Sequence, residues 1–419
     1  MSTLIKPFRG LRPAPGRAAE IAAPPYDVLS SAEARHIVHG SNGSSSKTWS
    51  FLHISKPEID LPADTDPHDP SVYAKAAENL GNMLDAGVLT RDATPCYYAY
   101  RLTMYANGRD HVQTGLVATA AVACYDSNRI RKHEFTRPDK EDDRVRQIEA
   151  TNAQTGPVLL AYPSSATADA LIDSIAQGKP AADVTADDGI RHQIWVLDDP
   201  ASIDAITRCF DGMEALYIAD GHHRSAAASR VAASRRQENC QLSSDHFLAV
   251  IFPHHQMNIL DYNRVVKDLN GLSVDDFLKS LAEKFLVSPA CDAVKPACPG
   301  EVGLYLPKRW YRLNIDPKLF SKDPVAGLDV SLLSEHVLGP ILGIADLRRD
   351  KRIDFVGGIR GLSELEKRVD SGEMAVAFSL FPTRMDQLMA VADCNQVMPP
   401  KSTWFEPKLA DGLVSHVLD

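Results

Sequence analysis

The alternation of strand-like and helix-like segments between residues 158 and 235 constrains the fold most strongly. Short apolar runs indicate strands at Val158–Tyr162, Gln193–Leu197 and Ala215–Ala219. Helical patterns are expected at Thr167–Ala176, at Ala201–Phe210 and in an Ala-rich stretch that ends near Arg235. Alternation of this kind predicts an α/β layer.

The segments on either side of this layer add further strands and helices. Tyr97–Tyr105 and His111–Tyr125 flank an Asn107-Gly108 turn signal, which is typical of a β-hairpin. We therefore predict an α/β fold, α+β overall, with a mixed-sheet body. We expect an N-terminal α+β lobe at residues 1–129, a central part at 130–270 and a C-terminal α+β lobe at 271–419, whose tail closes the site.

Charge and hydropathy exclude several classes of function. The 45 basic and 55 acidic residues of this 419-residue chain give a net charge of −10, which repels a nucleic-acid backbone. The longest weakly polar stretch, Gly115–Tyr125, is shorter than the roughly 18–20 apolar residues of a membrane helix, and MSTLIKPFRG lacks the apolar run of a signal peptide. We expect a cytoplasmic protein with no nucleic-acid or membrane partner. The seven cysteines form no CxxC pair, so we expect neither a disulfide framework nor a zinc ribbon.

The segment from Tyr217 to Ala228 (YIADGHHRSAAA) carries the sharpest chemical signal. An apolar strand ends in Asp220-Gly221 and passes directly into a strong helix former. The free N–H groups and the dipole at the start of a helix favour the binding of an anion there. Gly221 permits a phosphate to approach the backbone closely, and the guanidinium of Arg224 adds a forked hydrogen-bond donor. The alternative is that Asp220 caps the helix while both histidines bond locally. Shared metal binding by His222 and His223 is disfavoured, because successive helical residues point about 100° apart.

Two further polar segments are candidates for the same site. The run His133-Glu134-Phe135-Thr136-Arg137 precedes Lys140 and Arg144, and its carboxylate could serve as a general base or belong to a solvated helix face. It does not match HExxH, because Arg137 stands four residues after His133. The C-terminal segment 398–408 (MPPKSTWFEPK) combines rigid prolines with lysines that suit phosphate, or else packs its aromatic residues into the core.

Five blocks in order resemble the uncharacterised bacterial family numbered 1015 in the domain-of-unknown-function series. They are KPFRGLRP, APPYDVLS, HEFT, ADGHHRSAAA and MPPKSTWFEPKLADGLV, and they span almost the whole chain. The DGHHR block also resembles the nucleotide-phosphate motif of the ParB/sulfiredoxin superfamily, most closely that of its free-serine kinases. His222 stands where sulfiredoxins carry their redox cysteine, and no basic DNA-reading segment like that of ParB proteins is visible.

The resemblance implies a ParB/sulfiredoxin-like nucleotide-binding module within residues 130–270 and a small-molecule kinase. Its phosphoryl donor would be ATP or ADP with Mg²⁺, and its acceptor a small hydroxylated metabolite, L-serine above others. Phosphoryl transfer needs mainly positioning and charge neutralisation. The expected residues for nucleotide phosphates are Gly221, His222, His223, Arg224, Lys140, Arg144 and Lys401.

The remaining expected roles are catalysis and acceptor binding. Glu134 is assigned as general base, Asp220 orients the loop or Mg²⁺, and His223 assists. His133, Thr136, Ser402 and Thr403 are expected near the acceptor, and no protein metal site is assigned. The alternatives are a non-catalytic nucleotide-binding regulator, or a metal-dependent hydrolase in which His133, His222, His223 and His254 converge.

Overall fold

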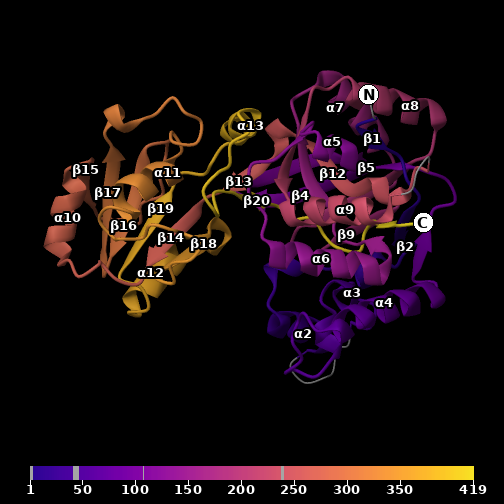
Figure 1. The fold of residues 1–419 in the computed structure, drawn as a ribbon, viewed down its shortest axis with the longest axis horizontal. Helices are drawn as coiled ribbons and strands as arrows, with labels where there is room; N and C mark the ends of the chain where they lie inside the picture. The colour runs from indigo at the N-terminus through magenta and orange to yellow at the C-terminus, as the bar shows by residue number, and fades with distance from the viewer. Residues whose placement is uncertain (1–2, 41–46, 107, 237–239) are drawn as a thin grey trace. The chain divides into compact units, whose positions relative to one another are not determined.

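The chain divides into two compact units in a computed structural model that describes residues 3–40, 47–106, 108–236 and 240–419. The first unit comprises Met1–Met257 and Pro407–Asp419, and the second comprises Asn258–Glu406. The second unit is therefore inserted between two segments of the first (Figure 1).

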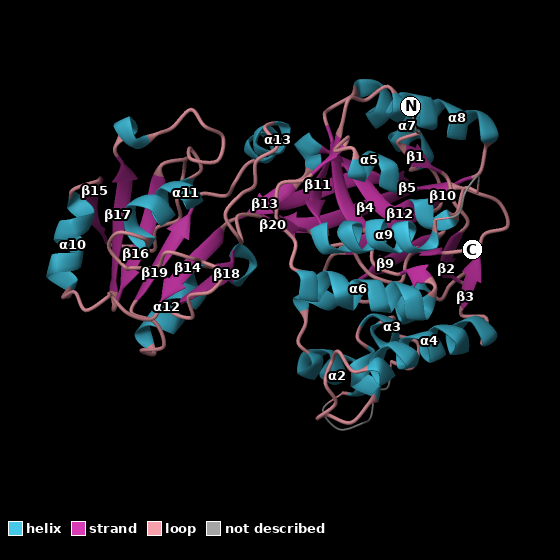
Figure 2. Cartoon of the chain, in the orientation of Figure 1, coloured by secondary structure: helices cyan, strands magenta, loops and turns pink. Residues whose placement is uncertain are grey.

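A nine-stranded mixed sheet forms the body of the first unit (Figure 2). Its strands run in the order β6 (Ile130–Arg131), β11 (Leu216–Asp220), β8 (Val158–Tyr162), β12 (His246–Pro253), β5 (Arg109–Ala121), β4 (Tyr97–Ala106), β10 (Arg191–Leu197) and β9 (Ala182–Thr185), and β1 (Ile5–Lys6) pairs with β5. β12 is parallel to β8 and β6 is parallel to β11, whereas the other pairs are antiparallel. The predicted mixed-sheet α/β fold is thus confirmed.

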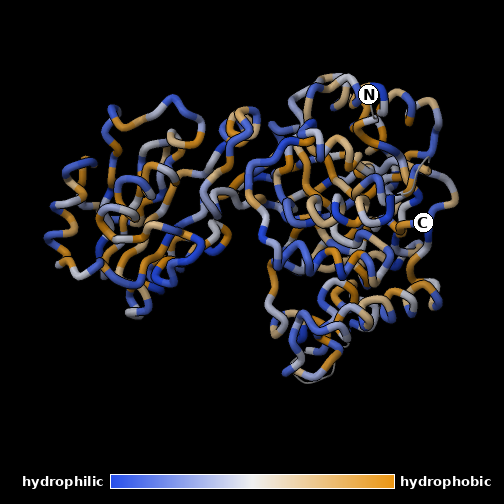
Figure 3. Tube along the Cα trace, viewed as in Figure 1, coloured by the Kyte–Doolittle hydropathy of each residue, from blue (hydrophilic) through white to orange (hydrophobic). Residues whose placement is uncertain are grey.

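One face of this sheet is buried under helices. Alternate side chains of the central strands, such as Leu116 and Ala118 of β5, belong to one apolar cluster with residues of the helices. The helices of this cluster are α5 (Val122–Asp126), α7 (Ala166–Ile175), α8 (Pro200–Asp211) and α9 (His222–Arg235). Figure 3 shows the apolar residues gathered inside the units. This burial fixes α9, whose first turn carries the candidate site, against the strand that precedes it.

The N-terminal segment adds a helical layer that is anchored by a small sheet. Its helices are α1 (Ala18–Ile21), α2 (Ser31–His39), α3 (Leu52–Ser55) and α4 (Pro70–Asp85), followed by α6 (Pro138–Thr151), which packs against α4 and α9. The sheet runs β3 (Leu89–Arg91), β2 (Gly10–Pro13), β21 (Ser415–Val417) and β7 (Ala153–Gln154). Both ends of the chain therefore join the first unit.

The second unit contains a six-stranded antiparallel sheet. Its order is β15 (Phe285–Ala290), β17 (Arg309–Ile315), β16 (Glu301–Leu306), β19 (Val376–Leu380), β14 (Tyr262–Val266) and β18 (Ile353–Gly357). Its helices are α10 (Val274–Ala282), α11 (Asp329–Leu333), α12 (Leu362–Asp370) and α13 (Met385–Asp393). A two-stranded ribbon of β13 (Asn258–Leu260) and β20 (Trp404–Glu406) lies where the chain enters and leaves this unit.

The elements expected between residues 158 and 235 are confirmed, with bounds that differ by two residues at most. The hairpin is also present as β4 and β5, although Asn107 of its turn lies outside the described residues. The three-part division differs from the two units observed, because strands from residues 1–129 and 130–270 share one sheet. No helix in the described part of the chain is long and apolar enough to cross a membrane.

Gly412 is expected to be essential for packing the C-terminal segment. Its φ is +87°, and an added Cβ would lie 2.7 Å from Cβ and Cγ of Phe51, which is fully buried. Gly412→Ala should therefore lower the free energy of unfolding by roughly 2–5 kcal/mol, through backbone strain and overpacking together. Urea unfolding measures this loss.

Gly16→Ala is the matched control, because Gly16 has φ +83° but no atom within 4 Å of an added Cβ. Its free energy of unfolding should fall by about 1–2 kcal/mol, through backbone strain alone. Equal losses in the two variants would contradict the packing role of Gly412.

Candidate functional site

The candidate site is built at the junction of β11 and α9. β11 is buried and pairs with β8, and its register shifts between Ile218 and Asp220. Gly221 then turns the chain with φ +97°, and a Cβ there would lie 3.3 Å from the Cα of Val158, so only glycine fits without strain. The carboxylate of Asp220 accepts a hydrogen bond from the N–H of Gly221 at 2.8 Å and does not cap the helix.

Both histidines of the DGHHR block hold the loop that precedes α6. Nε2 of His222 accepts a hydrogen bond from the backbone N–H of His133 at 3.4 Å, and Nε2 of His223 accepts one from the N–H of Arg137 at 3.1 Å. The rings of His133 and His222 also pack edge to face, with centroids 4.5 Å apart. The described hydrogen bonds of His222 and His223 therefore go to backbone N–H groups, and they join the segment 133–137 to the DGHHR block.

Burial keeps these imidazoles neutral. It lowers the pKa of His222 well below its usual value, lowers that of His223, and lowers that of His133 to about 4. An accepting Nε2 also requires the proton on Nδ1. His222 and His223 thus act near neutral pH as acceptors that position a loop, and only their Nδ1–H groups remain as donors.

Glu134 lies beside this pair of rings, outside the cavities described below. Its Oε2 is 3.8 Å from Nδ1 of His222, and its side chain is 40% exposed. Thr136 is half-buried, whereas Lys140 in the first turn of α6 is exposed. Glu134, Thr136 and Lys140 are all absent from the cavity walls that Arg224 lines.

Arg224 brings three distant segments together. Its guanidinium donates to Oδ2 of Asp27 at 2.9 Å and to the carbonyl of Pro157, and it lies 5.8 Å from the ring centroid of Tyr26. Nζ of Lys408 donates to Oδ2 of Asp220 at 3.3 Å. The N-terminal block, the DGHHR block and the C-terminal block therefore meet at the start of α9.

The charged side chains at this junction shift one another's pKa values. Burial alone would raise the pKa of Asp220, but the neighbouring Lys408 and Arg224 outweigh it, so this pKa lies below its usual range. The pKa of Arg224 is raised despite its burial, because Asp27 and Tyr26 lie beside it. Arg224 therefore remains a cation and Asp220 an anion across the physiological pH range.

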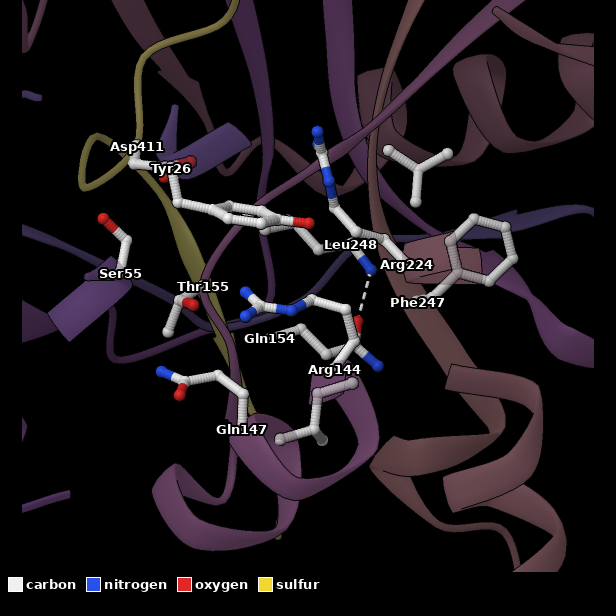
Figure 4. A pocket seen from close by; sticks show the side chains of 13 residues that line it. Tyr26, Ser55, Arg144, Gln147, Gln154, Thr155, Arg224, Phe247, Leu248 and Asp411 are labelled. Atoms are coloured by element: carbon white, nitrogen blue, oxygen red, sulfur yellow. Dashed lines mark hydrogen bonds between the residues drawn. The ribbon is translucent and has the colours of Figure 1, made fainter. Parts of the chain in front are cut away.

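Two cavities share the side chains of Arg224 and Asp411. The first is shown in Figure 4 and is lined by residues that include Tyr26, Ser55, Arg144 and Thr155. The second is lined by Pro25, Asp27, Pro157, Leu159, Asp220, Arg224, Lys408, Leu409 and Asp411. The guanidinium carbon of Arg144 lies 4.0 Å from the ring centroid of Tyr26, and the guanidinium pairs with Asp143. Arg144 therefore lines the first cavity rather than the first turn of α9.

The predicted residues Lys401, Ser402 and Thr403 belong to the second unit. Nζ of Lys401 lies 5.7 Å from the ring centroid of Tyr262, and the hydroxyl of Ser402 donates to the carbonyl of Pro399 at 2.6 Å. The carbonyl of Ser402 accepts a hydrogen bond from Thr383 at 2.9 Å. These contacts lie within that unit, whereas Lys408 and Asp411, a few residues later, lie in the first unit.

The histidines expected for the alternative hydrolase do not form a metal cluster. Nδ1 of His254 accepts a hydrogen bond from the N–H of Ser164 at 3.0 Å, away from His133 and His222. Over the ranges that the structure describes, no three His, Cys, Asp or Glu side chains are placed to hold a metal ion.

Comparison with known proteins identifies the family. Residues 5–331 match the family described as protein of unknown function (DUF1015). The chain belongs to this family. The resemblance drawn from the five sequence blocks is thereby confirmed, and no curated protein matches the chain.

Several solved structures are distantly similar to this family member. A free serine kinase in complex with AMP is 12% identical, with a TM-score of 0.34, over 69% of this chain and 86% of the kinase. A conserved hypothetical protein from Pyrococcus furiosus is 14% identical, with a TM-score of 0.34, over 70% and 93%. SbnI with C-terminal truncation, from Staphylococcus aureus, is 11% identical, with a TM-score of 0.36, over 70% and 85%.

Sequence reasoning missed four residues of this site, namely Tyr26, Asp27, Lys408 and Asp411. Each lies inside a block that carries the family resemblance, APPYDVLS or MPPKSTWFEPKLADGLV. Their position inside those blocks was the one feature of the sequence that could have marked them as site residues. Tyr26 and Asp27 had no visible partner in sequence, because the guanidinium that binds Asp27 stands 197 residues away.

The buried ring of His133 is expected to make stability depend on pH. In the folded protein it is protonated only near pH 4, against a usual value of 6.5, so the unfolded chain binds more protons between these values. The free energy of unfolding therefore falls as pH drops through this window. Between pH 7 and pH 5, the free energy of unfolding of His133→Leu should fall by about 2 kcal/mol less than that of wild type. Urea unfolding at the two pH values measures this difference.

His36→Leu is the control, because His36 is exposed on α2. It should follow the pH dependence of wild type. A His133→Leu profile that is parallel to wild type would contradict the neutral, buried state of this ring.

Proposed function

We propose that this protein is a phosphotransferase that moves a phosphoryl group from ATP or ADP to the hydroxyl of a small metabolite. The observation that carries the proposal is the meeting of Arg224 and Lys408 at the start of α9. The first-turn N–H groups of a helix and a forked guanidinium together suit the oxygens of a phosphate. Gly221, with φ +97°, makes the turn that leads β11 directly into the first turn of α9.

The charge balance of the site supports a metal–nucleotide complex rather than a bare phosphate. The second cavity is lined by the cations Arg224 and Lys408 and by the carboxyl groups of Asp27, Asp220 and Asp411. With two cations against three carboxyl groups, a polyphosphate would therefore meet at least as much negative as positive charge. Mg²⁺ carried on the nucleotide phosphates would supply the missing positive charge when bound.

L-serine is the favoured acceptor. The support is the resemblance of Asp220–Arg224 to the corresponding block of the free-serine kinases. The cavity that would take this acceptor has polar lining residues such as Ser55 and Thr155, and it adjoins the phosphate site through Arg224 and Asp411.

Arg224→Ala should weaken ATP binding by about 10²-fold, because it removes a charged fork and leaves Asp27 unpaired. Arg230→Ala is the matched control on the same helix, where Arg230 is exposed and pairs with Glu141 and Asp142. Calorimetric titration with Mg²⁺ and ATP measures both affinities. Equal affinities in the two variants would contradict the assignment of the phosphate site.

Phosphorus NMR tests the reaction itself. The protein is incubated with Mg²⁺ and L-serine and, separately, with ATP, ADP or pyrophosphate. A phosphomonoester that requires both serine and a donor is the expected product, and it identifies the donor directly. Nucleotide binding without a phosphomonoester from serine or other hydroxylated metabolites would favour a nucleotide-sensing regulator instead.

A further inference from the structure

Asp411 occupies an unusual place between the two cavities. Its side chain lines both of them, together with Arg224. The backbone holds it firmly, because Ala23 and Asp411 exchange N–H···O hydrogen bonds of 3.1 and 2.9 Å. A group at this position can reach a ligand in either cavity.

The carboxyl group of Asp411 is buried and incompletely bonded. The residue is 2% exposed, and its Oδ2 has no hydrogen-bond partner. The hydroxyl of Ser55, which also lines the first cavity, is likewise buried and without a hydrogen-bond partner. Buried polar atoms in folded proteins are nearly always bonded, so two unpartnered polar atoms that line one cavity indicate that it takes a polar group.

The charges around Asp411 set its acidity. Burial, together with the neighbouring Asp27, raises the pKa of Asp411 to about 7, although Arg224 and Arg144 act against this shift. The backbone N–H of Tyr26 also donates to it, and Asp220 and Lys408 line the shared cavity. A carboxylate with a pKa near the working pH is suited to general base catalysis.

We propose that the cavity lined by Tyr26, Ser55, Arg144 and Thr155 binds the hydroxylated acceptor, and that Asp411 is the general base on its hydroxyl. This inference rests on the proposed phosphotransferase function. It replaces the role that the sequence alone suggested for Glu134, which lies beside His222 and lines neither cavity.

The chemical step balances without a further reactant. The acceptor hydroxyl gives its proton to Oδ2 of the ionised Asp411. Its oxygen forms a bond to the terminal phosphorus of the nucleotide, whose bond to the bridging oxygen breaks. The leaving nucleotide keeps that electron pair, and Arg224 and Lys408 lie where the negative charge develops.

Asp411→Asn and Glu134→Gln distinguish the two candidate bases. Asp411→Asn should lower kcat for phosphoserine formation by about 10²–10⁴-fold without abolishing the binding of Mg²⁺ and ATP, because Arg224 and Lys408 are still present. Glu134→Gln should retain more than about a tenth of the wild-type kcat. Loss of activity in Glu134→Gln with retention in Asp411→Asn would overturn the assignment.

The pH profile separates a base from a structural role. In wild type, kcat/KM should rise with pH and level off above about 7, because only ionised Asp411 accepts the proton. The residual activity of Asp411→Asn should lack this rise. An unchanged rise in the variant would assign the titration to another group and overturn the proposal.

Gly156 provides a test of the acceptor cavity. A Cβ at this residue would lie 3.5 Å from Oδ1 of Asp411 and 3.6 Å from Cδ of Arg224, which is ordinary contact, and its φ is not left-handed. Gly156→Ala should weaken L-serine binding by about tenfold or more, because its methyl group enters the cavity. Gly81→Ala, with nothing within 4 Å of the added Cβ, is the matched control.

L-serine binding, measured by calorimetry with Mg²⁺ and a non-hydrolysable ATP analogue, separates failure of this inference from failure of the proposed function. If wild type forms no phosphorylated product but binds L-serine, and Gly156→Ala alone abolishes binding, the cavity assignment holds and the kinase proposal fails. Absence of L-serine binding to wild type would overturn the cavity assignment. Equal binding by Gly156→Ala and Gly81→Ala would overturn it as well.

Discussion

The ion pair between Arg224 and Asp27 is the interaction on which the site depends. A guanidinium that is 13% exposed must have an anionic or carbonyl partner, since an unpaired buried charge costs several kcal/mol. Arg224 finds both, in Asp27 and in the carbonyl of Pro157. The requirement to neutralise one side chain of α9 therefore fixes the N-terminal segment over the end of β8.

The C-terminal segment completes the same arrangement from the other side. Asp411 pairs through its backbone with Ala23, next to the segment that Arg224 holds, and Lys408 reaches Asp220. The two chain ends thus enclose the start of α9 between them. Enclosure removes water from Asp411, and the same burial that makes its carboxyl group a base near neutral pH also defines the wall between the two cavities.

The sequence predicted the parts of this structure that depend on local pattern. β8 follows from a short apolar run, α7 and α8 from helical patterns, and α9 from an Ala-rich stretch. The turn at Gly221 follows from a strand that runs directly into a helix former. The sequence did not predict Lys408 as the partner of Asp220, because these residues are 188 positions apart and no local signal marks such a pairing.

The location of Lys401–Thr403 in the second unit has a related cause. The block from Met398 to Val414 is continuous in sequence, but the boundary between the units falls inside it, after Glu406. The 149 residues of the second unit (258–406) separate Lys408 and Asp411 from the rest of their own unit. Such an insertion costs little, since the entropy of closing a loop grows only with the logarithm of its length. A chain can therefore complete a site with its last residues after folding a separate unit, and composition alone does not show where that unit ends.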